Sequence, residues 1–199
     1  MGSTRLRRSI SVAILGALSA ILMFLQFPIL PAAPYMQLDL SLLVIMLGSI
    51  LFGARDGALI SLIAVLIHMF VRGMNPLYVI GDSIAFVASL AYVLPLYGML
   101  HVHSLKKSWR VVIGIVLATV SLTVVMAMFN GWIMFPIYIQ AGGLPQSTNI
   151  MALITSVVVP FNLIKGVIIG LSFWLVYWRL EPWMNRQQAS VAFKSKHTH

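Results

Sequence analysis

The chain has 199 residues, of which 60% are hydrophobic and 9% are charged, and its 13 lysines and arginines against four acidic residues give a net charge of +9. A soluble domain usually carries about 25% charged residues, so the soluble-enzyme classes are excluded, and the absence of cysteine excludes disulfides and thiolate chemistry. The composition instead predicts an all-α integral membrane protein, with residues 1–199 forming a single membrane domain.

Six apolar stretches follow one another along the chain and are expected to be transmembrane helices. They cover about residues 10–27, 38–53, 57–72, 78–101, 110–130 and 150–179. A span in lipid has to be helical, because no water is available there to bond exposed backbone groups. The second and third stretches hold only about 15 apolar residues, fewer than the roughly 20 that cross a bilayer, and so carry the weakest signal.

The lysines and arginines are distributed unevenly between the connections. With six spans, both termini lie on one side of the membrane. The opposite side holds only Arg72, and Lys165 lies inside the last span. The positive-inside rule therefore predicts that both termini are cytoplasmic. A basic start is also compatible with a cleaved signal peptide, but the apolar run continues unbroken to Pro28, which favours a retained helix. The side of the termini collects Arg5, Arg7, Arg8, Arg55, Lys106, Lys107, Arg110, Arg179, Arg186, Lys194 and Lys196.

Two connections on the outer side are expected to serve the function. The segment 27–35 is rich in proline, which prevents a helix from continuing. The segment 135–149 is the longest predicted loop, and long loops in compact proteins are usually functional or disordered. Both segments lie where a substrate would arrive from outside.

The sequence contains no arrangement of residues that is typical of catalysis. It has no His-Glu-x-x-His motif and no Walker lysine motif, and its five histidines and four carboxylates are scattered along the chain. We therefore expect neither an enzyme nor a metal site, and no hydrolysis of ATP by this chain itself.

The last apolar stretch contains the run Pro160-Phe-Asn-Leu-Ile-Lys-Gly166, which places two polar side chains at membrane depth. Asn162 and Lys165 are three residues apart and therefore lie on one face of a helix. A lysine in mid-membrane costs about 2.5–3.5 kcal/mol, so we expect it to face a ligand cavity. The structural alternative is a lysine that bonds to backbone carbonyls or pairs with Asp39 or Asp82.

Asn130, at the expected outer end of the fifth helix, is a further candidate for ligand binding. Its amide offers two hydrogen-bond donors and an acceptor, which suits a flat heterocycle carrying both N–H and C=O groups. The candidates to cover the faces of such a ring are Trp132, Phe135, Tyr138 and Tyr78. Tyrosine and tryptophan also gather at membrane interfaces without binding a ligand, and for each aromatic alone that alternative is favoured.

Small residues recur at a spacing of four in the first helix. Ala13 and Ala17 form one pair, and Gly16 and Ala20 form another. Small residues at this spacing let a second helix approach closely. They are candidate contacts for a partner subunit.

Several runs of the sequence, spread from about residue 12 to residue 183, resemble a known family. The sequence is similar to the riboflavin-specific substrate-binding subunit, or S component, of energy-coupling factor (ECF) vitamin transporters. The most specific element is the Pro-Phe-Asn-x-Ile-Lys-Gly run. The resemblance rests on Leu25-Gln-Phe-Pro28, Tyr35-Met-Gln-Leu-Asp-Leu-Ser41, Asn130 with Pro136-Ile-Tyr138, Pro160 to Gly166 and Leu180-Glu-Pro-Trp183.

This resemblance implies a six-helix subunit of a bacterial plasma membrane that binds riboflavin from the outside. FMN is left open as a second ligand, and no separate cofactor is expected. It implies that the ligand is read by Asn130, Asn162 and Lys165, with Asp39 and Tyr138 nearby. It also implies a complex with one membrane coupling subunit and two cytoplasmic ATPases. The small residues of the first helix, with Ala13 and Ala17 as the chosen pair, would face the coupling subunit.

Two alternatives stay open from the sequence. Subunits with the same fold bind other vitamins, so a ligand such as pantothenate is one of them. A stand-alone secondary transporter is the other, and it would need a membrane-embedded carboxylate for ion coupling, for which Asp39 and Asp82 are the candidates.

Overall fold

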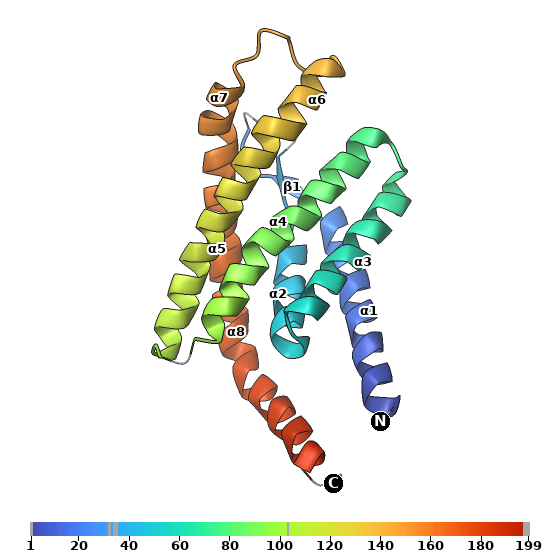
Figure 1. Cartoon of the computed structure of the whole chain (residues 1–199), viewed down its shortest axis with the longest axis vertical. Helices are drawn as coiled ribbons and strands as arrows, with labels where there is room; N and C mark the ends of the chain where they lie inside the picture. The colour runs from blue at the N-terminus through green and yellow to red at the C-terminus, as the bar shows by residue number, and fades with distance from the viewer. Residues whose placement is uncertain (1, 32, 34–35, 103, 197–199) are drawn as a thin grey trace.

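The computed structural model describes residues 2–31, 33, 36–102 and 104–196, and it is helical apart from one short two-stranded sheet (Figure 1). Side chains are described within residues 5–179, except at 32, 34, 35, 77 and 103. The elements are α1 (Gly2–Phe24), β1 (Phe27–Pro28), β2 (Gln37–Leu38), α2 (Ser41–Phe52), α3 (Ala54–Arg72), α4 (Pro76–Leu100), α5 (Lys107–Phe129), the π-helical turn η1 (Asn130–Met134), α6 (Phe135–Gln140), α7 (Ile150–Leu153), the π-helical turn η2 (Ile154–Val158) and α8 (Val159–Lys196).

Five helical segments of the described chain are long and apolar enough to cross a membrane, which agrees with an all-α membrane protein. The remaining apolar helix, α2, has only 12 residues. The first and last helices run beyond their expected bounds, to Gly2 and Lys196, because the prediction counted apolar residues and the helices continue into polar sequence. The five segments are Arg5–Phe24, Ala54–Arg72, Tyr78–Leu100, Lys107–Gln140 and Ile150–Arg179.

The expected break after residue 130 is wrong, because the helix continues through η1 into α6. The long loop expected over 135–149 shortens accordingly to 141–149. Pro136 lacks an N–H, and its ring would clash with the carbonyl four residues earlier, at Trp132 inside η1. A π turn is wider than an α turn and accommodates this clash. Pro160 stands in the same relation to Ser156 inside η2.

The helices pack in a consistent order. In Figure 1, α1 lies beside α3, α4 crosses α5, and α5 runs along the segment that contains α8. Gly170 on α8 allows the closest of these approaches, because a Cβ there would lie 2.3 Å from Ile115 of α5. Tyr92 of α4 is fully buried, and its hydroxyl donates a hydrogen bond to the Gly166 carbonyl oxygen at 2.7 Å.

The connections divide between two ends of the molecule (Figure 1). The start of α1, the end of α8 and the connections at residues 53 and 101–106 lie at one end, which we call the terminal end. The connections at 73–75 and 141–149 lie at the other, which we call the loop end. The basic side of the sequence therefore maps to the terminal end.

Residues 36–39, shortly before α2, are buried or half-buried. Phe27 of β1 pairs with Leu38 of β2, and the chain then reaches Asp39, which contacts Lys165 inside the helical bundle. Irregular backbone at membrane depth is tolerated only where protein or a cavity surrounds it. Helix α2 is short because this extended chain replaces its first turns.

Candidate functional site

Lys165 is paired inside the bundle. Its Nζ lies 3.6 Å from Oδ2 of Asp39, and each side chain is 16% exposed. The other carboxylate oxygen of Asp39 accepts hydrogen bonds from the backbone N–H of Ser41, at 2.9 Å, and from the Ser41 hydroxyl. Asp39 therefore bonds to the first residue of α2 and balances the charge of Lys165 with the same carboxylate.

This pair settles which acidic residue lies beside Lys165. Asp82, the other acidic candidate from the sequence, is 2.9 Å from Nδ1 of His68 instead, and both of those side chains are buried. Lys165 is therefore paired in the fold. Lys165 nevertheless lines a cavity, so pairing and facing a cavity are combined at one residue.

The cavity beside Lys165 is small and partly polar. Its volume of about 40 Å³ is of the order of one water molecule, whose share of liquid volume is about 30 Å³. Pockets that hold drug-sized ligands measure about 300–1,000 Å³. The cavity must widen to admit a ligand of that size. It is lined by Asp39, Ser41, Ser61, Ser89 and Lys165 together with apolar side chains from α1 to α5, which are Met23, Leu42, Ile45, Val65, Ala85, Ala88 and Leu122.

Asn130 and Asn162 each lie in or near one of the two π turns. Asn130 begins η1, and Asn162 follows η2 by one turn. Each amide nitrogen donates to the carbonyl four residues earlier, Met126 and Val158 respectively, at 2.8 Å. Both side chains are buried, and within the described residues each amide oxygen has no hydrogen-bond donor. Each asparagine therefore keeps a free acceptor.

The depths of the two asparagines also match. The sequence predicted that Asn130 ends its helix. In the structure the helix continues to Gln140. At 1.5 Å per residue, Asn130 lies roughly 15 Å and Asn162 roughly 18 Å from the loop end of its own helix. Lys165, one turn further, lies at roughly 22 Å. The three polar groups thus occupy adjacent levels on two neighbouring helical segments, and of the three Lys165 alone lines the small cavity.

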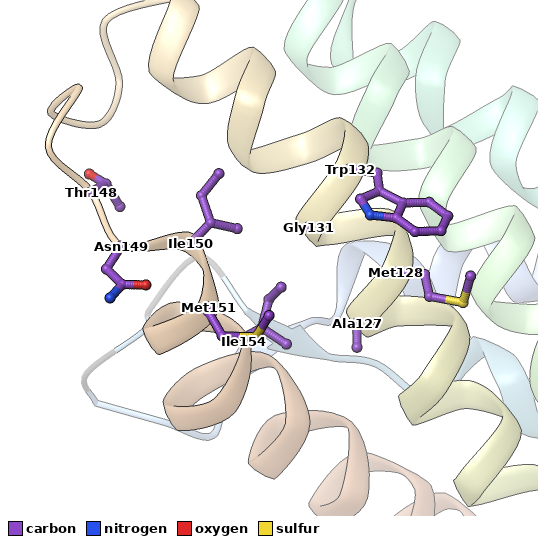
Figure 2. A pocket seen from close by; sticks show the side chains of 9 residues that line it. All are labelled: Ala127, Met128, Gly131, Trp132, Thr148, Asn149, Ile150, Met151 and Ile154. Atoms are coloured by element: carbon purple, nitrogen blue, oxygen red, sulfur yellow. The ribbon is translucent and has the colours of Figure 1, made fainter.

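A larger hollow of about 650 Å³ lies between η1 and the α7–η2 segment (Figure 2). It contains no ionisable group, and its wall is mostly apolar. Of its two polar residues other than Trp132, Asn149 already accepts a hydrogen bond from the Ala152 N–H at 3.1 Å, and Thr148 donates to the Pro145 carbonyl. Its chemistry does not suit a polar heterocycle, so the smaller cavity is the better candidate site.

The aromatic candidates Trp132, Tyr78 and Tyr138 do not line the small cavity. Trp132 is 75% exposed. Tyr78 packs under the guanidinium of Arg72, 4.3 Å from its ring centre. Tyr138 is half-buried where α6 ends, and its carbonyl oxygen accepts the Gly143 N–H at 2.9 Å. Trp132 and Tyr78 thus fit an interfacial position, and Tyr138 lines neither hollow.

Sequence reasoning missed several buried polar groups. Ser61 of α3 and Ser89 of α4 are hydrogen-bonded to each other across 2.5 Å and line the cavity. The only signal in the sequence was hydroxyl side chains inside apolar stretches, and such residues often bond to their own helix instead. Within the described residues, no group of three or more histidine, aspartate or glutamate side chains is placed to hold a metal ion.

The small residues of α1 divide between two faces. Ala13 and Ala17 are exposed, whereas Gly16 and Ala20 are buried against α3. A Cβ at Gly16 would lie 2.6 Å from Ile63 of α3. The second pair therefore serves packing within the chain and is not available to a partner. The side chains of Tyr35 and of 180–183, which contributed to the resemblance, lie outside the described residues.

The fold and the enclosed polar site define an all-α, multi-pass membrane protein. The chain belongs to the ECF transporter, substrate-specific component family, whose model matches residues 7–177. It is 30% identical over 182 residues to the riboflavin transporter RibU of Staphylococcus aureus, covering 90% of this chain and 93% of that protein. It is 23% identical over 189 residues to the riboflavin transporter FmnP of Bacillus subtilis, covering 94% and 98%.

A solved structure agrees with these relatives. The S component of a bacterial ECF transporter superimposes with a TM-score of 0.75 at 28% identity, covering 90% of this chain and 98% of that one. The relatives are transporters rather than enzymes.

Proposed function

We propose that the chain captures riboflavin at the outer face of a bacterial plasma membrane and is the substrate-binding subunit of an ATP-driven transporter. The observation that carries the proposal is the placement of Asn130, Asn162 and Lys165 at adjacent levels of neighbouring helices. The names of the relatives, riboflavin transporters, support the choice of vitamin.

The chemistry of the three residues suits the polar edge of a flavin. That edge carries one N–H between two carbonyl groups. The free amide oxygen of Asn130 or Asn162 accepts from the N–H, and the ammonium of Lys165 donates to a carbonyl. Because Asp39 balances Lys165, the site has no net charge, which favours a neutral ligand such as riboflavin. Tyr138 is placed in the site only by the resemblance.

The orientation follows from charge. The terminal end collects the basic residues, so we place it in the cytoplasm and the loop end outside. Helix α2, together with the five long helices, then makes six spans, and a ligand enters from the loop end.

Energy for uptake comes from partners, because the sequence has no ATP-binding lysine motif. We assign a membrane coupling subunit to the exposed face of α1 at Ala13 and Ala17, where small side chains allow a helix to approach. Two cytoplasmic ATPases complete the complex. The chain needs no cofactor of its own, and the transported vitamin is its ligand.

The alternatives are less well supported. Both carboxylates that a secondary transporter would use, Asp39 and Asp82, have basic partners. Pantothenate lacks the flat ring that we propose the three polar groups bind. FMN adds a phosphate, for which the described cavity offers only one cation, already paired with Asp39.

Titration of the purified protein with riboflavin tests the proposal. We expect binding at one molecule per chain, seen as quenching of flavin fluorescence as the ring becomes buried among side chains. Pantothenate, added in excess before riboflavin, serves as the control and should not compete. A correctly folded protein that leaves flavin fluorescence unchanged at micromolar concentration would contradict the proposal.

A further inference from the structure

Ser61 and Ser89 are a pair of buried hydroxyls at the α3–α4 contact. Ser61 is 1% and Ser89 5% exposed. Their oxygens are 2.5 Å apart, and both line the cavity that contains Asp39 and Lys165. Neither residue has a role in the polar edge recognition described above.

The hydrogen bonds of the pair determine what it can offer. The hydroxyl of Ser89 also donates to the carbonyl oxygen of Phe86 at 2.8 Å. A hydroxyl has one proton, so Ser61 is the donor in the bond between the serines. Both protons are therefore used, and the remaining capacity of the two oxygens consists of lone pairs. The pair can only accept further hydrogen bonds.

A group that donates from several hydroxyls matches this arrangement. The flat ring of a flavin has one N–H on its polar edge, but the chain attached to riboflavin carries four hydroxyls. The same cavity is lined by Ala85 and Ala88, whose small side chains leave room for a slender chain when the cavity widens.

We propose that Ser61 and Ser89 form a subsite that reads the hydroxyl chain of the ligand, while Lys165 and the asparagines read the ring. The inference rests on the proposed function, because it concerns the second half of the same ligand. The alternative is that the bond between the serines only holds α3 to α4, because hydroxyls commonly form hydrogen bonds between membrane helices.

Two ligands that differ only in the hydroxyl chain distinguish a ligand subsite from a purely structural hydrogen bond. Riboflavin carries the hydroxyl chain, and lumiflavin has the same ring with a methyl group in its place. Ser61→Ala should weaken riboflavin binding about three- to tenfold, the effect of one lost hydrogen bond between neutral groups. Lumiflavin binding to the same variant should stay unchanged. Ser89→Ala should act in the same direction.

Ser49→Ala is the matched control. Ser49 is as buried as Ser61, and its hydroxyl donates to the Ile45 carbonyl at 2.9 Å, but it does not line the cavity. This variant should bind both flavins like the unmodified protein. The melting temperature of each variant, measured without ligand, verifies that it is folded.

The outcomes are distinct. Loss of riboflavin affinity alone supports the subsite. Equal loss for both flavins, or no loss for either with a lower melting temperature, assigns the pair to packing and overturns the inference. An unmodified protein that binds neither flavin contradicts the proposed function itself, and this result is distinguishable because it does not depend on the serines.

Discussion

Lys165 combines an ion pair and a cavity-lining position in one side chain. Its ammonium is 3.6 Å from Asp39, in a site that is mostly but not fully buried. Removing one partner of a buried pair leaves the other charge without compensation, which costs about 3–5 kcal/mol when burial is complete. At 16% exposure and this distance we expect a smaller effect.

Lys165→Met should lower both the stability of the ligand-free protein and its affinity for riboflavin. The expected loss of stability is about 1–3 kcal/mol, because Asp39 is stranded. The affinity should fall about ten- to hundredfold, as for a lost hydrogen bond from a charged donor. The ligand-free melting temperature and a flavin titration measure the two quantities.

Asp39→Asn separates the two roles. Asparagine keeps an acceptor for the Ser41 N–H but removes the charge. The double variant Lys165→Met, Asp39→Asn should recover much of the lost stability without recovering affinity. A double variant that regains riboflavin binding would show that Lys165 holds the fold and does not read the ligand.

At the scale of the elements, two prolines accompany a π turn instead of ending a helix. Pro136 and Pro160 each follow a π turn by two residues, and the two turns contact each other. Gly131 in η1 permits the contact, because a Cβ there would lie 2.8 Å from Ile154 of η2. The asparagines beside these turns are thereby brought to one level, and π turns are frequent at functional sites.

The contact of α8 with α5 depends on glycine. Gly170→Ala should destabilise the protein by about 1–3 kcal/mol, because the added methyl would overlap Ile115 and the Tyr92 hydroxyl. The melting temperature of the purified variant tests this. Gly98→Ala on α4 is the control: its Cβ has no neighbour within 4 Å, so alanine should be neutral or stabilising by up to about 1 kcal/mol.

The exposed face of α1 is where a partner is expected. Ala13→Trp or Ala17→Trp should leave riboflavin affinity near normal and weaken copurification with the coupling subunit, because a bulky ring prevents close helix approach. Val120→Trp, on an exposed face of α5, is the control and should copurify normally. Normal assembly of both alanine variants would move the docking surface elsewhere.

For the whole molecule, the distribution of charge and the arrangement of the helices agree. Basic residues accumulate at the end where α1 starts and α8 finishes, and this end also holds the connection between α4 and α5. The positive-inside rule then predicts that this end faces the cytoplasm.

Single cysteines test this orientation on a background that has none. Gln146→Cys in the 141–149 connection should react with a membrane-impermeant thiol reagent in intact cells. Ser104→Cys, between α4 and α5, should react only after the membrane is permeabilised. Both positions are exposed in the structure. The reverse pattern of labelling would invert the proposed topology.

The sequence by itself determined the class of protein, the approximate helices and the polar residues worth testing. These follow from local properties: the hydropathy of a stretch, the charge of a connection and the three-residue spacing of Asn162 and Lys165. The same local reasoning placed Asn130 at a helix end, because it treated the sequence around Pro136 as a loop.

Only the tertiary structure decided which of these groups meet. Asp39 rather than Asp82 reaches Lys165 because the chain before α2 enters the bundle, and no local pattern encodes that depth. Ala13 is exposed while Gly16 is buried because α3 covers one face of α1. Contacts between helices depend on which faces pack together, and residues distant in sequence settle that choice through the shape and volume of their side chains.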